Sequence, residues 1–184
     1  FAGHEVWGLD KKPPQFVTPK HFILHDLTKP IETLEWFDLI IHLAANARVH
    51  DLVIDPQMAQ DNITMVFNAL EYARKTETPK FIFASSREVY GNGNEMPVKE
   101  GVGSQRTSES PYSTSKLAGE SYCWSYSKCY GIDTKIVRFS NVYGRYDFSN
   151  RFIPKVIRNL KANRPSEIWG KDKVLDFTHI SDAV

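Results

Sequence analysis

The chain has 184 residues and a formal net charge of +1 at pH 7, with 41% hydrophobic and 24% charged residues. This is the composition of an ordinary globular protein with one domain, or one domain and part of a second. The near-zero charge argues against nucleic acid and against an anionic membrane as partners, and no apolar run approaches the roughly 18 residues of a membrane span. Two cysteines are too few for a disulfide framework, which favours a cytoplasmic location.

Five apolar runs predict β-strands, at residues 5–9, 21–24, 38–43, 80–84 and 134–139. The middle runs are continuously apolar, as in strands buried on both faces of a parallel sheet. Helices are predicted between them, from Asp55-Pro56 to about Arg74, from Pro111 to Tyr130 with Gly131 as the stop, and from about Arg151 to Lys161. The alternation of strands and helices predicts a doubly wound α/β fold with a parallel sheet.

The two ends of the chain predict an internal fragment of a longer protein. Residue 1 is Phe rather than Met, and residues 1–4 are typical of a helix end with its C-terminal glycine. Residues 180–184 stop where a further helix begins.

Polar and small residues follow the predicted strands, where an open parallel sheet binds its ligands. Asp10 follows the first strand, and a carboxylate there accepts hydrogen bonds from both hydroxyls of an adenosine ribose and repels a 2′-phosphate. Asp26 follows the second strand and could hold an adenine amino group, although either residue could instead be an exposed loop carboxylate. Ala44 and Ala45 follow the third strand and allow a ligand close to the backbone. These positions favour NAD over NADP.

A second group of residues predicts proton transfer. Ser86 lies at the end of the fourth strand, and Tyr112 and Lys116 lie at i and i+4 on one face of the helix that follows the loop. An ammonium group close to a phenol favours the phenolate, which is a base. The Tyr-x-x-x-Lys spacing is weak by itself, and its position after a strand that ends in serine makes it informative.

Seven stretches of the sequence resemble the extended short-chain dehydrogenase/reductases of the NAD-dependent nucleotide-sugar epimerase/dehydratase family, which include enzymes like UDP-glucose 4-epimerase. They occur in the family's order and cover nearly the whole chain: GHEVWGLD (3–10), HDL (25–27), DLIIHLAA (38–45), FIFASSREVYG (81–91), PYSTSKLAGE (111–120), VRFSNVYG (137–144) and DFTHISDAV (176–184). The resemblance implies a Rossmann-like domain at residues 1–145 without its first strand and Gly-rich loop. It implies the beginning of a small substrate lobe at residues 146–184.

The resemblance also implies roles for the matching residues. Tyr112 would be the catalytic base, Lys116 would hold the nicotinamide ribose, and Ser86 would bind the reacting hydroxyl. The NAD contacts would come from Asp10, Asp26, Leu27, Leu43, Ala44, Ala45, Tyr112 and Lys116. Asn141 and Trp169 would contact the nucleotide sugar, although Trp169 could equally be a core residue of a short strand. No metal ion is implied.

The activity implied first is epimerisation of a nucleotide sugar at C4 through a 4-keto intermediate. Glu88 leaves a 4,6-dehydratase or a decarboxylase open, although Arg87 stands where many dehydratases carry Asp. A non-catalytic NAD-binding sensor or scaffold is a third possibility, disfavoured because a sensor needs no base beside Ser86. The family further implies a homodimer built on the helices that begin at Pro56 and Tyr112. Met65 and Trp124 are the predicted exposed contacts.

Overall fold

The computed structural model describes residues 3–32, 35–92, 97–103, 106–168, 170, 172 and 174–184. The chain divides into two compact units, Phe1–Arg138 and Phe139–Val184. The predicted division into a dinucleotide-binding domain ending at residue 145 and a substrate lobe stays a prediction.

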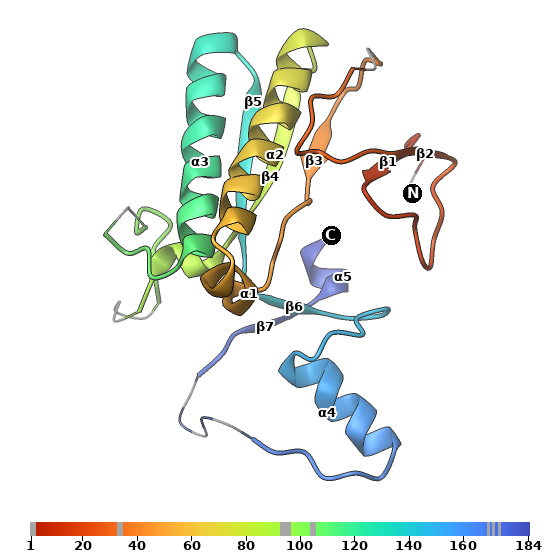
Figure 1. Ribbon diagram of the computed structural model, residues 1–184, viewed down its shortest axis with the longest axis vertical. Helices are drawn as coiled ribbons and strands as arrows, with labels where there is room; N and C mark the ends of the chain where they lie inside the picture. The colour runs from red at the N-terminus through yellow and green to blue at the C-terminus, as the bar shows by residue number, and fades with distance from the viewer. Residues whose placement is uncertain are drawn as a thin grey trace. The chain divides into compact units, whose positions relative to one another are not determined.

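The first unit is an α/β structure with parallel strand pairs, which confirms the predicted fold class (Figure 1). β1 (Trp7–Asp10) pairs in parallel with β2 (His21–Leu24), and β3 (Ile40–His42) pairs in parallel with β4 (Lys80–Ser86). β5 (Asp133–Phe139) completes a three-stranded sheet in the order β3-β4-β5. The carboxyl ends of these strands are the places where the sequence predicts ligand contacts.

Two long helices, α2 (Gln57–Lys75) and α3 (Pro111–Tyr130), lie side by side over one face of the three-stranded sheet (Figure 1). Local signals determine both ends of α3. Ser110 and Ser113 form a reciprocal capping box, Pro111 occupies the first turn, and Gly131 ends the helix in the left-handed conformation at φ 72°. The predicted helix at 56–74 is α2, preceded by a short helix, α1 (Val49–Ile54), that the sequence analysis missed. Six residues are too few to produce a helical period.

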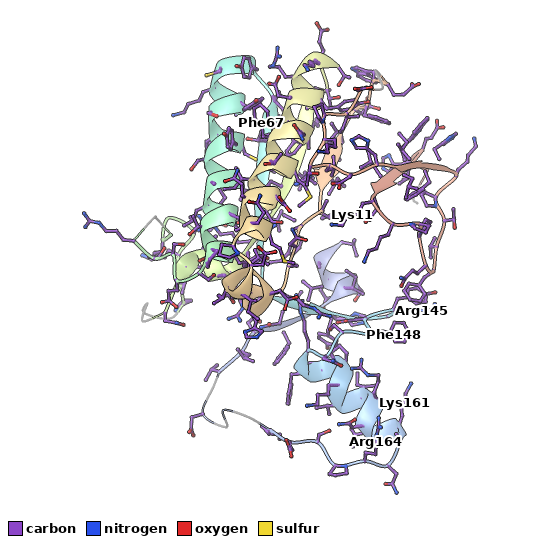
Figure 2. All side chains as sticks on the ribbon, viewed as in Figure 1. Lys11, Phe67, Arg145, Phe148, Lys161 and Arg164 are labelled. Atoms are coloured by element: carbon purple, nitrogen blue, oxygen red, sulfur yellow. The ribbon has the colours of Figure 1, made fainter. Side chains whose placement is uncertain are left out.

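The core of this unit lies between α2, α3 and the sheet. Val66, Leu70 and Ala73 of α2 are buried. They form one cluster with Ala69 of the same helix and with residues of β4, α3 and the segment after α3, namely Phe81, Phe83, Cys123, Tyr126 and Ile132. Phe67, labelled in Figure 2, lies where α2 faces α3, and its ring meets that of Tyr122 edge-on at 5.9 Å.

The prediction that Met65 is an exposed dimer contact is wrong. Met65 is 5% exposed and lines a cavity at the inner side of α2, because α2 turns this position toward the strand ends. Trp124 is 59% exposed, as expected. The homodimer itself stays a prediction.

Gly119 allows α3 to approach β4 closely. A Cβ added at Gly119 would overlap the ring of Phe83, with Cε1 only 2.8 Å away. Phe83 is itself 2% exposed and has no free space to move into. The distance between α3 and β4 therefore depends on the absence of a side chain at position 119.

The second unit contains a parallel pair of short strands, β6 (Asn141–Tyr143) and β7 (Phe177–His179). It also contains α4 (Phe152–Lys161), close to the predicted bounds, and α5 (Ile180–Ala183). None of the helices in the described parts of the chain combines the length and the apolar character that a membrane crossing needs.

We predict that Gly119→Ala lowers the free energy of unfolding. Alanine improves helix propensity by about 1 kcal/mol, but overpacking of a closed core costs about 1–3 kcal/mol, and the overlap with Phe83 makes the second effect larger. Urea denaturation measures the difference. Gly101→Ala is the control, because a Cβ there meets nothing within 4 Å. Equal stability of Gly119→Ala and the control would contradict the close-packing argument.

Candidate functional site

The end of β4 positions the predicted serine. Ser86 is 7% exposed, and its hydroxyl accepts a hydrogen bond of 3.2 Å from the backbone N–H of Glu88, so it caps the short 3₁₀-helix η1 (Arg87–Tyr90). The preceding Ser85 is also buried and donates its hydroxyl hydrogen to Glu120 at 2.5 Å. Both serine side chains at the end of β4 therefore form hydrogen bonds with neighbouring residues.

The first turns of α3 bring Tyr112 and Lys116 to the same strand end. Both side chains are buried, at 8% and 5% exposure. Lys116 Nζ donates to the carbonyl oxygen of Ala84 at 2.7 Å and lies 5.8 Å from the centre of the Tyr112 ring. Ser86, Tyr112 and Lys116 therefore all lie at the junction of β4 and α3, and their catalytic roles stay predictions.

Lys116 is a buried cation in apolar surroundings. Its ammonium lies 5.1 Å from the centre of the Phe83 ring, and burial lowers its pKa to about 8. It still carries its charge at pH 7. On β3, His42 lies between the rings of Phe81 and Phe83, and burial, followed by the charge of Lys116, lowers the pKa of His42 to about 3. His42 is therefore neutral at pH 7, whereas Lys116 is charged.

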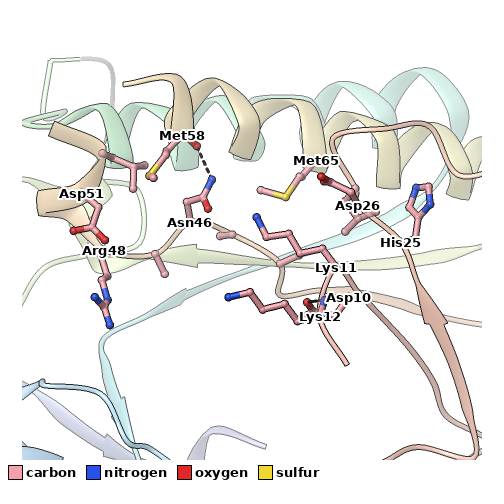
Figure 3. A pocket seen from close by; sticks show the side chains of 15 residues that line it. Asp10, Lys11, Lys12, His25, Asp26, Asn46, Arg48, Asp51, Met58 and Met65 are labelled. Carbon is pink, nitrogen blue, oxygen red and sulfur yellow. Dashed lines mark hydrogen bonds between the residues drawn. The ribbon is translucent and has the colours of Figure 1, made fainter. Parts of the chain in front are cut away.

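A cavity of about 390 Å³ opens at the carboxyl ends of β1, β2 and β3 (Figure 3). Its wall includes Asp10, the last residue of β1, and Asp26, two residues after β2, together with Leu27, Ala44 and Ala45. The wall also includes Leu52, which packs against Tyr112 in a small apolar cluster. The structure therefore brings five of the predicted cofactor contacts to one cavity, and the cavity wall touches the predicted catalytic tyrosine.

The two carboxylates are held in the turns that follow their strands. The backbone N–H of Lys12 donates to Asp10 Oδ1 and that of Thr28 donates to Asp26 Oδ1, both at 2.9 Å. The hydrogen bonds from Thr28 lower the pKa of Asp26, so its side chain is ionised at neutral pH. Lys11 and Lys12 extend from the end of β1 along the same cavity (Figure 3).

Three asparagines that the sequence analysis missed hold the cavity loops in place. The side chain of Asn62 accepts from the backbone N–H of Asn46 at 2.7 Å, and donates to the carbonyl oxygen of Asn46 and to Ser115 Oγ. Asn46 in turn donates to Met58 O at 3.1 Å (Figure 3). Asn68 donates to Leu27 O at 2.8 Å. For Asn62 and Asn68, the available signal in the sequence was the position of an amide side chain on the apolar face of the helix.

Other predicted site residues lie elsewhere. Leu43 is 65% exposed and is not among the residues that line the cavity. Glu88 lies on η1, where its carboxylate pairs with the guanidinium of Arg87 at 3.1 Å. Asn141 belongs to the second unit and donates its amide hydrogen to Asp176 O at 2.9 Å. Trp169 lies outside the described residues.

A family model described as the NAD dependent epimerase/dehydratase family matches residues 1–184. The chain belongs to this family. Its relatives include both epimerases and dehydratases. A putative UDP-glucose 4-epimerase of Methanocaldococcus jannaschii is 36% identical over 154 residues, which are 79% of this chain and 49% of that protein. The dTDP-D-glucose 4,6-dehydratase of Homo sapiens is 30% identical over 170 residues, which are 91% of this chain and 47% of that protein.

Solved structures agree with the family assignment. The UDP-N-acetylglucosamine 4-epimerase from Methanobrevibacter ruminantium M1, in complex with UDP-N-acetylmuramic acid, matches with a TM-score of 0.78 at 30% identity. The match covers 87% of this chain and 54% of that one. This chain therefore spans about half the length of the relatives it matches.

We predict that Lys116→Met changes the pH dependence of stability. Between pH 8 and 10.5 the wild-type folded chain has lost the Lys116 proton while the unfolded chain retains it, so wild-type stability rises with pH relative to the variant. The full change is about 3 kcal/mol, and the difference is flat below pH 8. Urea denaturation of both proteins at several pH values, without cofactor, measures it. A constant difference across this range would contradict burial of a charged Lys116.

Proposed function

We propose that the protein is an NAD-dependent enzyme that epimerises a nucleotide sugar, with C4 as the reacting carbon. The observation that carries the proposal is the junction of β4 and α3, where Ser86, Tyr112 and Lys116 are all buried at one strand end. The family to which the chain belongs supports a nucleotide sugar as the substrate class, because its relatives include 4-epimerases as well as 4,6-dehydratases.

The cavity residues are suited to the adenosine half of NAD. Asp10 would accept hydrogen bonds from the ribose hydroxyls, Asp26 would accept one from the adenine amino group, and Leu27 offers an apolar surface. Ala44 and Ala45 leave the backbone accessible at the third strand end. When bound, NAD supplies a hydride acceptor for the sugar carbon.

The chain's own residues would move and hold the proton. Tyr112 accepts the proton of the sugar hydroxyl, and the ammonium of Lys116 stabilises the phenolate that does so. Lys116 is suited to this because it is charged at pH 7 and its described hydrogen bond goes to a neutral carbonyl, that of Ala84. Ser86 would donate a hydrogen bond to the substrate oxygen.

One observation keeps a 4,6-dehydratase or decarboxylase as the second candidate. Glu88 lies two residues after Ser86, on the helical turn that Ser86 caps, and could supply a further acid or base. Its carboxylate lies 3.1 Å from the guanidinium of Arg87. A non-catalytic sensor has no use for a phenol beside a buried ammonium.

We predict that Tyr112→Phe abolishes most turnover. The assay incubates the protein with NAD and a panel of nucleotide sugars and follows products by mass spectrometry and sugar analysis. An unchanged mass with a new sugar supports the epimerase, loss of water the dehydratase, and loss of carbon dioxide the decarboxylase. Wild-type protein with no product from any sugar would contradict the proposed enzyme.

The substitution removes a proton acceptor while keeping the ring, so turnover falls about 10²–10⁴-fold and binding of the nucleotide sugar changes little. Phe in place of the exposed Tyr130 is the matched control and leaves the rate unchanged. Retention of more than about a tenth of the wild-type rate by Tyr112→Phe would exclude Tyr112 as the base.

Asp10 is predicted to set the choice between NAD and NADP. Asp10→Ala removes the ribose acceptor and leaves Lys11 and Lys12 free to attract a 2′-phosphate, so NAD affinity falls about ten- to hundredfold while NADP affinity falls less or rises. Isothermal titration calorimetry with both dinucleotides gives the ratio, and Asp38→Ala, outside the cavity lining, is the control. An unchanged ratio would rule out this role.

A further inference from the structure

A buried polar network extends from α3 to the strand end that carries Ser86. At its centre is Glu120, which is 6% exposed and lies one helical turn after Lys116. Its carboxylate accepts two parallel hydrogen bonds from Arg138, from Nε at 2.8 Å and Nη2 at 2.7 Å, and a third from Ser85 Oγ at 2.5 Å. The ion pair raises the pKa of Arg138, so this guanidinium is permanently charged.

Arg138 connects the network to the segment after η1. Its Nη1 donates to the carbonyl oxygens of Glu100 at 2.9 Å and Val102 at 2.6 Å. Its guanidinium also lies over the Tyr90 ring, 4.8 Å from the centre. A Cβ at Gly103 would come within 3.3 Å of both Nη atoms. The Arg138 side chain therefore connects residues 100–103 to η1.

The network contacts the chain on both sides of Ser86. Ser85 precedes it directly, and Tyr90 is the last residue of the turn that Ser86 caps. The direction of the Ser86 hydroxyl depends on the path of β4 into η1, and the network holds that path at both ends. By contrast, no described contact joins Glu120 or Arg138 to the cavity residues Asp10 and Asp26.

Stability alone is a weak reason for such a network. Burying two charges removes their hydration, so a buried ion pair contributes little compared with apolar residues of the same volume. A pair that fixes geometry is a better explanation, because small displacements of a reacting group reduce rates strongly. We propose that Glu120 and Arg138 are positioning residues that orient Ser86 for the substrate oxygen; the inference rests on the proposed function.

The test compares Glu120→Gln with a matched control. Glu71 on α2 also binds an arginine through two parallel bonds, from Arg74 at 2.9 and 3.0 Å, and also accepts a hydroxyl bond, from Tyr126 at 2.7 Å. Glu120→Gln should lower kcat about ten- to hundredfold with unchanged NAD affinity, whereas Glu71→Gln leaves kcat unchanged. An equal effect of both substitutions on kcat would overturn the proposal.

A double mutant separates positioning from general destabilisation. If Glu120 acts through Ser86, then Glu120→Gln adds no further loss of kcat in a Ser86→Ala background. A fully multiplicative loss would overturn the proposal. If Glu120→Gln does not fold, Arg138→Lys serves instead, since one ammonium cannot make the two parallel bonds and reach both carbonyls. The same non-additivity with Ser86→Ala is then expected.

Amide hydrogen exchange gives a readout that does not need activity. Glu120→Gln should speed exchange at residues 86–90 and 100–103 and leave α2 unchanged, and unaltered exchange there would overturn the proposal. A wild-type protein without turnover would contradict the proposed function only. Faster exchange confined to those segments would then still support the network as the device that holds Ser86.

Discussion

The hydrogen bond from Lys116 Nζ to the carbonyl oxygen of Ala84 joins α3 to β4, and the candidate site is arranged around this contact. The bond requires the helix to approach the strand closely, which the missing side chain at Gly119 and the flat ring of Phe83 allow. Because Tyr112 lies one turn before Lys116, the same approach places the phenol over the strand end. A helix held farther from the strand would move Tyr112 and Lys116 away from Ser86.

The buried cation Lys116 and the partly buried cation Arg138 are stabilised in different ways. Arg138 is paired with Glu120, and its charge is balanced within the network. Among the described residues, no carboxylate forms an ion pair with Lys116. Its ammonium group contacts a carbonyl oxygen and two aromatic rings instead. Burial therefore lowers the pKa of Lys116, and a nearby negative charge would stabilise its ammonium form. A phenolate at Tyr112 would provide that negative charge, which supports tyrosine as the proposed base.

The cavity depends on side chains that do not themselves carry charge. Asn62 and Asn68 lie on the inner face of α2 and hold the loops after β3 and β2 by their backbone groups. These loops carry Ala44, Ala45, Asp26 and Leu27, so α2 determines where the cavity wall lies. The bond from Asn62 to Ser115 continues this framework into α3, one residue before Lys116. The cavity wall and the candidate catalytic residues Tyr112 and Lys116 are thus attached to one pair of helices.

Local chemistry in the sequence was sufficient for the five strands β1 to β5, for both ends of α3 and for the Tyr112–Lys116 pair, whereas the short strands β6 and β7 were not predicted. Apolar runs, a capping serine before proline, a terminal glycine and an i, i+4 spacing are all properties of short segments. The strand-end positions of Asp10, Asp26 and Ser86 followed as well, because a parallel sheet places its carboxyl ends together. The tertiary structure alone decided which long-range partners meet. Glu120 and Arg138 are 18 positions apart, and Asn62 and Ser115 are 53 apart. The burial of Met65 and the closeness of Gly119 to Phe83 were equally undetermined, because a periodic pattern does not specify which neighbour covers a given face.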